Sequence, residues 1–397
     1  MTDRTMSDAS VPLALYLHIP FCRQRCSYCA FNTYAGLDGI IPVYVDALCR
    51  ELALVGAAGS RPAIHTVYFG GGTPSLLPAQ DVARILEQVR LAFAPVGVPE
   101  VTLEANPGAV GEDYFRRIRE AGVNRLSLGA QSYQATDLKL FRRVHVWQDV
   151  VAAVAAARQA RFDNLSLDLI YGAPGQDLPG WRASVEQAVA LQPEHLSLYS
   201  LGLEPGTAMC SWVERGMVSA PDPDLAADMY ELAGEILTRQ GYEQYEISNW
   251  ARPGYACRHN LQYWLREPYL GFGAGAHGFA VDMRYAVVAS PQEYIRRLSG
   301  TLIEGRFPLS PAVAVETVEV IDPVEARAEY MLLGLRLTHA GVSRPAFARR
   351  FGLSLEECYP NQLRELESLG LIEALPDRVR LTARGRLLGN YAFAYFV

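Results

Sequence analysis

Three closely spaced cysteines near the amino terminus are the residues of this chain most suited to chemistry. Cys22, Cys26 and Cys29 follow the apolar run LALYLHIPF with the spacing C-x3-C-x2-C. Cysteine thiolates are the usual ligands of iron–sulfur clusters. Three thiolates can hold three irons of a cubane [4Fe–4S] cluster, and the fourth iron then stays open to a small chelating molecule. The spacing therefore predicts a cluster with one exchangeable position.

A zinc site is the alternative interpretation of the same cysteines. Structural zinc takes four ligands, so Cys49 or His18 would have to supply the fourth. Cys49 lies in a run that reads as helix, and thiols without any metal are a further alternative. His18 could instead donate to a cluster sulfur or be a satisfied core histidine. Phe31, the aromatic neighbour of the cysteines, is expected to serve in packing.

A glycine-rich segment, GGGTPS over Gly70–Ser75, follows the second predicted strand. Glycine lets the main chain approach a ligand closely and adopt positive φ. Such a segment could offer main-chain donors and acceptors to amino and carboxylate groups. The alternative is a tight turn before a helix, with Pro74 near the first helical position. Its place one strand after the cysteines favours ligand binding.

Four polar residues lie on or just past the ends of predicted strands: Glu104, Gln131, Arg143 and Asp168. Charged side chains are rarely fully buried unless they are paired or used. Glu104 shares a strand face with Thr102 and could accept hydrogen bonds from ribose hydroxyls or an ammonium group. The fork of Arg143 suits a carboxylate. Each residue alone could form a rim salt bridge, but together they favour a ligand site.

The elements that must position these residues alternate between strand and helix. Strands are predicted at Leu13–Phe21, His65–Gly70, Glu100–Asn106, Arg125–Gln131, Leu165–Tyr171 and His195–Leu201. Helices are predicted at Pro42–Val55, Ala79–Ala92, Glu112–Ala121, Asp149–Ala160 and Trp181–Leu191. This alternation predicts an α/β fold with a parallel sheet and right-handed crossovers. In β/α barrels the chemistry gathers at the carboxyl ends of the strands, where the polar residues fall.

The alternation fades after residue 215. Residues 222–240 read as an amphipathic helix, and a glycine- and aromatic-rich stretch runs from YEQYEISNW to GFGAGAHGF. Further on, MLLGLRL, FARRFGL and NQLRELESLGLIEAL read as helices and RVRLT as a strand, which is typical of a winged-helix-like domain. The predicted organisation is a disordered tail over 1–12, a barrel over 13–215, an extension over 216–305 and a C-terminal helical domain over 306–397.

The composition is that of an ordinary globular protein, with 50% hydrophobic and 20% charged residues in 397. The net charge of −7 argues against non-specific binding to nucleic acid. The start MTDRTMSDAS lacks the apolar core of a signal peptide, and no apolar run is long enough to span a membrane. Seven cysteines, three of them too close together for a disulfide framework, favour the reducing cytoplasm.

Several segments together resemble the oxygen-independent coproporphyrinogen oxidase-like branch of the radical S-adenosylmethionine (SAM) superfamily. They are YLHIPFCRQRCSYCAF, YFGGGTPSLL, VTLEANP, RLSLGAQSY, LDLIYGAPGQ and HNLQYW. The resemblance runs from Leu15 to the C-terminus and is greatest to the HemW-type haem chaperones. It implies a partial (β/α)6 TIM-like barrel of the radical SAM type and a C-terminal α-helical domain.

The resemblance also implies the cofactors and their positions. A [4Fe–4S] cluster is expected on Cys22, Cys26 and Cys29, with methionine's amino and carboxylate groups on the open iron. By motif position, SAM is expected near Tyr16, Gly71, Gly72, Thr73, Glu104, Gln131, Arg143, Asp168 and Gly202. Tyr16 is expected to pack against the cluster or the adenine.

Two departures separate the chain from the true oxidase. The oxidase pattern reads C-x3-C-x2-C-x-C, and Phe31 occupies the last position here. The oxidase also carries a long N-terminal segment that helps to cover the porphyrinogen. Both differences argue against oxidative decarboxylation of coproporphyrinogen III.

The segment His259–Trp264 fits the H-N-x-x-Y-W motif of the HemW-like group. His259 could ligate haem iron, and the two aromatic residues of the motif offer flat surfaces for a macrocycle. Capping and hydrogen bonding in a structural loop are the alternative. His277, Cys257 and Cys210 are competing haem ligands.

The leading hypothesis is a haem chaperone that delivers haem to apo-haem proteins such as respiratory enzymes. The second is a radical SAM enzyme, either a coproporphyrinogen III dehydrogenase of porphyrin biosynthesis or a methyltransferase. A third is a nucleic-acid-binding wing, against which the acidic balance argues. Its basic residues are Arg344, Arg349, Arg350, Arg378, Arg380, Arg384 and Arg386. The chain is expected in the cytoplasm without a nucleic-acid partner, and the sequence leaves peripheral membrane contact and a homodimer open.

Overall fold

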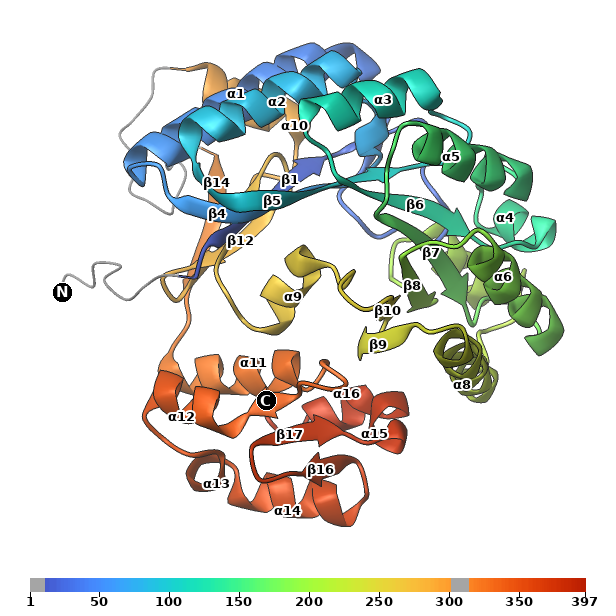
Figure 1. The fold of residues 1–397 in the computed structure, drawn as a ribbon, viewed down its shortest axis with the longest axis vertical. Helices are drawn as coiled ribbons and strands as arrows, with labels where there is room; N and C mark the ends of the chain where they lie inside the picture. The colour runs from blue at the N-terminus through green and yellow to red at the C-terminus, as the bar shows by residue number, and fades with distance from the viewer. Residues whose placement is uncertain (1–10, 301–313) are drawn as a thin grey trace.

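The computed structural model describes residues 11–300 and 314–397 of the chain. These residues form a curved sheet with helices on its outer side and a small domain against its open side (Figure 1). The tail predicted over residues 1–12 and the boundary predicted at residue 306 lie mostly or wholly outside the described residues. The remaining domain boundaries stay predictions.

Six parallel strands lie side by side in chain order and form the barrel wall. They are β1 (Leu13–Ile19), β4 (Ala63–Gly71), β5 (Ala94–Ala105), β6 (Arg125–Gln131), β7 (Leu165–Tyr171) and β8 (His195–Ser200). The helices between them are α1 (Ile41–Ala58), α2 (Ala79–Ala92), α3 (Glu112–Ala121), α5 (Trp147–Gln159) and α6 (Leu178–Ala190). The predicted partial (β/α)6 barrel is confirmed, with some element ends shifted.

Side chains of the barrel strands alternate between an apolar outer face and a polar inner face. In β7, Leu165, Leu167 and Leu169 are buried in the core that the helices cover. Ser166 and Asp168, between them, point inward and bond to each other. Successive strand residues point to opposite faces, so one face of each strand can be polar throughout. The barrel interior is therefore built to hold polar chemistry rather than an apolar plug.

The sheet continues beyond the six strands at both edges. At one edge β11 (Tyr269–Phe272) pairs in parallel with β1, and β12 (His277–Ala280), β13 (Met283–Val287) and β14 (Val315–Val320) follow antiparallel. At the other edge β10 (Asn249–Ala251) and β9 (Glu243–Glu246) follow β8. The short helix α9 (Arg258–Trp264), which carries HNLQYW, lies inside the curve of the sheet (Figure 1).

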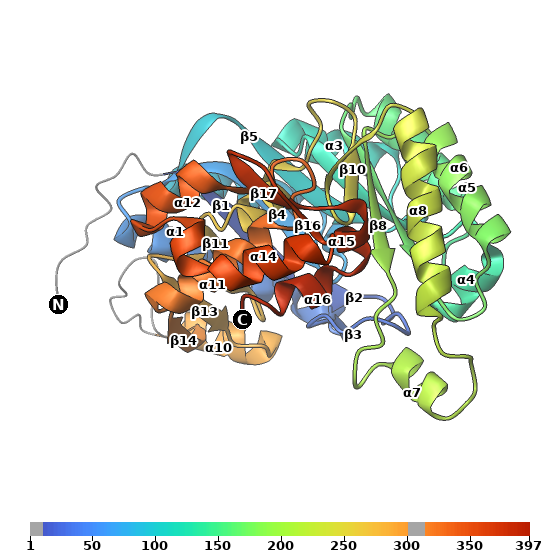
Figure 2. The ribbon, with the colours of Figure 1, turned by 90° about the horizontal axis from the view of Figure 1, so that it is seen from below.

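The other elements of this part are short, apart from α8 (Pro223–Arg239), which fulfils the amphipathic helix predicted over 222–240. They are β2 (Phe21–Cys22), β3 (Tyr34–Ala35), α4 (Ala135–Leu140), α7 (Ala208–Glu214) and α10 (Pro291–Ser299). Figure 2 shows α7 projecting from the body on a loop after β8. In the described parts of the chain, no helix has the length and apolarity needed to cross a membrane.

The C-terminal domain has its own apolar core and a three-stranded sheet in the order β15-β17-β16. Its helices are α11 (Pro323–Gly334), α12 (Arg344–Phe351), α13 (Leu355–Cys358), α14 (Pro360–Ser368), α15 (Ala383–Leu387) and α16 (Gly389–Phe393). Its strands are β15 (Val342–Ser343), β16 (Ile372–Ala374) and β17 (Arg378–Leu381). The prediction of helix throughout NQLRELESLGLIEAL is wrong, because Gly370 turns the chain with φ +67° and a strand follows.

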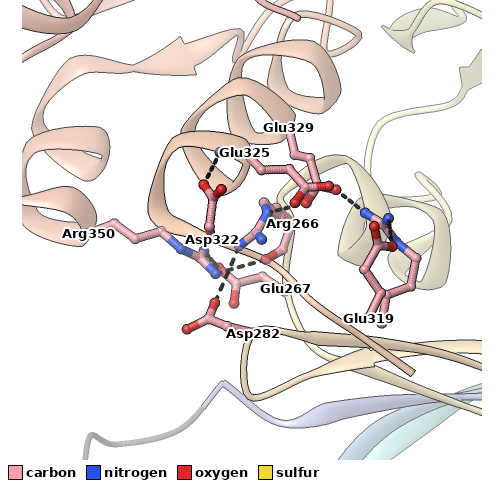
Figure 3. Close-up of polar contacts among 9 residues, drawn as sticks. Arg266, Glu267, Asp282, Glu319, Asp322, Glu325, Glu329 and Arg350 are labelled. Atoms are coloured by element: carbon pink, nitrogen blue, oxygen red, sulfur yellow. Dashed lines mark hydrogen bonds and ion pairs between the residues drawn. The ribbon is translucent and has the colours of Figure 1, made fainter.

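A buried arginine joins the C-terminal domain to the barrel directly after α9 (Figure 3). The Arg266 Nε donates to Glu329 of α11 at 2.9 Å, and Arg284 of β13 pairs with the same carboxylate. Arg350 of α12 donates to the Arg266 carbonyl at 3.0 Å. The Arg266 guanidinium lies 4.5 Å from the Phe279 ring centre. Burial, and to a smaller extent Arg350, lowers the pKa of Arg266 to about 10.

Candidate functional site

A cavity of about 500 Å³ opens at the carboxyl ends of the barrel strands. All three clustered cysteines line it, together with every predicted SAM contact except Tyr16. These residues are Cys22, Cys26, Cys29, Gly71, Gly72, Thr73, Glu104, Gln131, Arg143, Asp168 and Gly202. The structure thus brings eleven of the twelve residues predicted to hold the cluster and SAM around one space.

The loop that carries the cysteines is anchored to neighbouring segments at its centre. The Ser27 Oγ donates to the Leu140 carbonyl at 2.6 Å, and the Ser27 amide donates to the Phe141 carbonyl at 3.2 Å. The Met209 amide of α7 donates to the Ser27 carbonyl at 2.7 Å. These contacts hold the loop over the cavity while leaving the three thiols available, since none forms a disulfide.

Burial around the thiols disfavours free thiolates in the absence of a bound metal. Burial raises the pKa of both Cys22 and Cys26, and the nearby Arg143 guanidinium opposes that rise. Metal binding deprotonates a coordinating thiol, so it would overcome this burial effect. In the described part of the chain, no three His, Cys, Asp or Glu side chains converge closely enough to hold a single ion. A cubane places each thiolate on a different iron and needs no such convergence.

The glycine-rich segment is locked against the cysteine loop by main-chain contacts. The Gly72 amide donates to the Ile19 carbonyl and the Thr73 amide to the Phe21 carbonyl, each at 2.8 Å. A Cβ at Gly72 would lie 2.6 Å from the Phe21 oxygen. Gly71 has φ +113°, and a Cβ there would meet the His18 ring at 2.6 Å. Only glycine fits both positions, which places the segment's main chain directly at the cavity wall.

A chain of hydrogen bonds links the predicted carboxylate-binding arginine to a cysteine. The Arg143 Nη1 donates to Asn106 at 2.9 Å, the Asn106 amide donates to the Thr73 hydroxyl at 3.1 Å, and that hydroxyl donates to the Cys22 sulfur at 3.6 Å. The buried Nε of Arg143 has no acceptor within the described residues. Buried donors are normally paired. An unpaired donor at the cavity fits an anionic ligand group such as a SAM carboxylate.

Two carboxylates lie at the inner end of the cavity. Glu104 accepts from the Tyr68 hydroxyl at 2.8 Å, and Asp168 accepts from Ser127 at 3.0 Å. Burial raises the pKa of Glu104 to about 7, and the nearby Asp168 adds to the rise. Burial also raises the pKa of Asp168. A cationic ligand would stabilise both ions, so the pair fits the ammonium, sulfonium and ribose groups of SAM.

Gln131 reaches the cavity through an unusual main-chain conformation. It ends β6 with φ +67°, which is rare for a residue other than glycine. Its side-chain amide lies close to Gly129, where a Cβ would approach Gln131 Nε2 to 2.8 Å and an Arg143 nitrogen to 3.0 Å. Strained conformations of this kind cluster at functional sites.

Tyr16 is the predicted SAM contact that the structure does not bring to the cavity. Its hydroxyl lies 3.2 Å from the Nδ1 of His18, and its ring stacks against Tyr68 inside the barrel. His18 has its other ring nitrogen 2.9 Å from the Asn32 carbonyl, so it is a satisfied core histidine. The prediction that Phe31 packs is wrong, because its side chain is 68% exposed at the cavity mouth.

The cavity-lining residues that were not predicted include Tyr68, Asn106, Ser127 and Tyr199. A signal for them exists in the sequence. Each lies two residues from a polar or glycine position on the same strand or its end. Period-two alternation therefore places it on the inner face.

His259 lies in a different place, at the barrel floor beneath the cavity. It is 1% exposed, with Nδ1 2.8 Å from the Thr66 hydroxyl and Nε2 2.8 Å from the Tyr263 hydroxyl. Its amide donates to Glu100 at 3.0 Å. Burial, with the nearby His65 and Arg125, lowers its pKa to about 3, so the ring is neutral. Haem ligation by His259 stays a prediction, and it would require one of the two ring contacts to be lost.

The competing haem ligands have varied surroundings. His277 is exposed at the start of β12. Cys257 is buried and donates to Glu100 at 3.5 Å, and Cys210 lies in α7 with Glu214 as its acceptor at 3.5 Å.

The arginines proposed for a nucleic-acid wing form ion pairs in four cases, namely Arg344–Glu356, Arg350–Glu267, Arg378–Asp377 and Arg380–Glu373.

Comparison with known families agrees with the fold. A model of the radical SAM superfamily matches residues 16–188, and a model of the HemN C-terminal domain matches residues 321–388. The structure of coproporphyrinogen III oxidase (HemN) from Escherichia coli superposes with a TM-score of 0.82 at 22% identity. The match covers 98% of this chain and 90% of that one. The barrel is therefore that of a radical SAM protein.

Curated relatives give a narrower assignment. The heme chaperone HemW of Bacillus subtilis is 38% identical over 96% of this chain and 98% of its own length. HemW of Mycobacterium tuberculosis is 40% identical, covering 96% of this chain and 93% of its own, and HemW of Escherichia coli is 36% identical, covering 97% and 98%. The chain belongs to the HemW family.

Proposed function

We propose that this protein is a haem chaperone, which binds haem and delivers it to apo-haem proteins such as respiratory enzymes in the cytoplasm. The observation that carries the proposal is the match to HemW relatives along nearly the whole chain. The absence of a fourth cysteine at Phe31, where the oxidase pattern has one, supports a chaperone over the oxidase.

We further propose that Cys22, Cys26 and Cys29 hold a [4Fe–4S] cluster and that SAM occupies the cavity beside it. Such a cluster, when bound, supplies one electron to the SAM sulfonium. The proposal gives Arg143 the SAM carboxylate, because its buried Nε lacks another acceptor among the described residues. Glu104 and Asp168 would face the cationic and ribose groups.

The protein's own residues would then orient SAM and exclude water. The main chain of Gly71 and Gly72 forms one wall of the cavity. Hydrogen bonds from this segment to the carbonyls of Ile19 and Phe21, just before Cys22, hold it in place. Arg143 is held by Asn106, so its fork is preorganised before a ligand arrives. Preorganised donors cost little to reorient on binding.

A two-part experiment tests the proposal. Protein purified and reconstituted without oxygen is titrated with haem, and the haem-loaded protein is then mixed with an apo-cytochrome. Haem uptake and transfer are the expected results. Incubation with coproporphyrinogen III, SAM and a reductant is the companion assay. Stoichiometric decarboxylated product there would overturn the chaperone assignment in favour of the oxidase.

A radical SAM enzyme of the same branch is the second candidate. It is favoured by one observation, the cavity whose lining unites the cysteines with the carboxylate pair and the arginine. Release of 5′-deoxyadenosine, measured with and without candidate substrates, separates the two. Release that depends on a substrate would favour the enzyme.

A further inference from the structure

The proposed function does not say where on the protein haem binds. The floor of the barrel is blocked for a flat ligand by the helix α9 and its contacts. The HNLQYW helix α9 fills that region, and His259 has both ring nitrogens in hydrogen bonds. Two more residues of the helix are engaged. Gln262 bonds to His65 at 2.9 Å, and the Trp264 ring lies 4.3 Å from the Arg336 guanidinium. A flat ligand could enter only after these contacts break.

The mouth of the barrel, in contrast, is hollow. A second cavity, of about 140 Å³, adjoins the SAM cavity and shares with it Gln24, Cys26, Thr73, Asn106 and Arg143. The two hollows are therefore neighbours across one wall, on the same face as the cysteine loop.

Three exposed arginines surround this double hollow. Arg23 lines the smaller cavity, Arg25 lines the larger, and Arg142 lines the smaller from the loop after α4. None of them has a carboxylate partner within the described parts of the chain. The Arg142 main chain has φ +56°, and its guanidinium lies 4.8 Å from the centre of the Trp212 ring. A chain with net charge −7 thus presents unpaired positive charge at this mouth.

The acids nearby are few and partly engaged. Asp149 lines the smaller cavity, but one of its oxygens accepts the Val146 amide at 2.9 Å. Glu204 lines the larger cavity near Gly202. Neither forms an ion pair with Arg23, Arg25 or Arg142 in the described residues, so the charges of the arginines are left for a ligand.

Exposed apolar side chains lie among these charges. Phe31, of the cysteine loop, is 68% exposed, and Val144, two residues after Arg142, is 77% exposed. Phe31 lines the larger cavity and Val144 the smaller one. An aromatic ring offers a flat surface to another ring, and arginine forks suit carboxylates. The combination selects a flat, apolar ligand that carries carboxylates at its edge.

We propose that haem binds across this mouth, with its propionate groups on Arg23, Arg25 and Arg142 and its ring against Phe31 and Val144. The inference rests on the proposed haem-binding function. In this arrangement haem covers the opening of the SAM cavity, and α9 keeps its place at the floor.

Haem titrations followed by absorbance test the proposal on reconstituted full-length protein. The first arm compares wild type with Arg23→Gln/Arg142→Gln and with Phe31→Ser. The control is Arg349→Gln/Arg364→Gln, which removes the same charge from exposed arginines of the C-terminal domain. The second arm compares haem with its dimethyl ester, which has no free carboxylates. Iron and sulfide content and SAM binding are measured for every variant, since Arg23 lies next to Cys22.

The mouth variants should lose about tenfold in haem affinity, a change of ~1.4 kcal/mol. Their cluster content and SAM binding should match wild type. The ester should bind wild type about tenfold more weakly than haem, and it should bind the arginine variant no worse than wild type. The control variant should behave as wild type.

Two outcomes would overturn the mouth site while leaving the chaperone function standing. One is wild-type haem affinity in both mouth variants. The other is loss of haem in His259→Gln, folded and with cluster intact, together with unaltered binding in the mouth variants. Failure of wild type to bind haem at all, with full iron content, would overturn the proposed function and the mouth site together.

Discussion

Polar and aromatic side chains occur at both ends of the barrel interior, but the two ends differ in how far these side chains are buried and hydrogen-bonded. At the floor, His259 and its partners are buried, and each ring nitrogen has a partner in the chain. At the mouth, the Arg143 Nε lacks an acceptor in the described residues, and Arg23 and Phe31 face outward. A buried polar group with all its bonds made serves the fold, whereas an unpaired one that lines a cavity can bind a ligand there. The His259 ring of the family motif is thus structural in this state, and the exposed arginines without a carboxylate partner among the described residues lie at the opposite end.

The largest contrast between the two ends is expected from paired cysteine substitutions. Cys26→Ala at the mouth should abolish iron binding, because two thiolates cannot hold the proposed cube. Cys257→Ala at the floor should keep full iron content, since that thiol only donates to Glu100. Iron and sulfide analysis with the cluster absorption measures both. Iron lost equally from the two variants would contradict the division between mouth and floor.

Removal of the His259 ring should give the next largest effect, on stability. His259→Ala leaves the hydroxyls of Thr66 and Tyr263 without partners and opens a hole beneath Tyr68, which stacks on the ring at 5.0 Å. The expected cost is about 2–4 kcal/mol in the free energy of unfolding. Denaturant unfolding of the reconstituted protein measures it. A cost under ~0.5 kcal/mol, the range of ordinary surface changes, would show that the floor is not a structural core.

SAM affinity should depend on pH through Glu104. Its pKa of about 7 means that the carboxyl is protonated below neutrality. SAM brings positive charge and binds the ionised form better, so affinity should rise severalfold between about pH 6 and about pH 8. Calorimetric titration of wild type and Glu104→Gln measures this. The amide variant should bind more weakly and lose most of the pH dependence. An equal slope in both would exclude Glu104 as the titrating group.

The same carboxyl sets a pH dependence of stability in the SAM-free protein. An unfolded glutamate has a pKa near the model-compound value of 4.5, and Glu104 has about 7 when folded. The folded state therefore holds the proton more tightly. Its contribution is fully present below pH 4.5 and is lost as the pH rises through about 7. Thermal unfolding of Glu104→Gln should show a smaller decline across that window than wild type.

The smallest effect should come from the mouth. Phe31→Ser removes a side chain that is 68% exposed, so the free energy of unfolding should change by less than about 0.5 kcal/mol. Val144→Ser, at a side chain 77% exposed, is the matched second variant. Denaturant midpoints at constant slope measure both. A loss of 2 kcal/mol or more would place Phe31 in the fold rather than at a binding surface.

The barrel could be predicted from the sequence because its strands and helices are long and strongly periodic. The outer faces of the strands are continuous apolar rows, and the helices are separated by glycine and polar turns. Strand ends in a parallel barrel meet at one face, so Glu104, Gln131 and Asp168 could be placed together without any knowledge of contacts.

The predictions at Tyr16, Phe31 and along NQLRELESLGLIEAL depended on tertiary detail. Tyr16 was predicted to pack against the cluster or the adenine, but its hydroxyl contacts His18 and its ring stacks on Tyr68. Phe31 sits in an anchored loop whose direction no local pattern encodes. For His259, the motif did not reveal that the side chain is buried. Its burial depends on the packing of α9 against β4 and β5, which local sequence does not encode.

Arg266 gives the protein a property that neither of its two domains has alone. Its Nη atoms have no hydrogen-bond acceptor in the described residues, and the carboxylate opposite its Nε comes from α11. A chimera that joins this barrel to a foreign C-terminal module without an acid at position 329 would leave the buried Arg266 with only its longer ion pair, 3.8 Å from Nη1 to Asp282. An exchange of the C-terminal domain within the family must therefore keep Arg266 and its acidic partner at position 329 together.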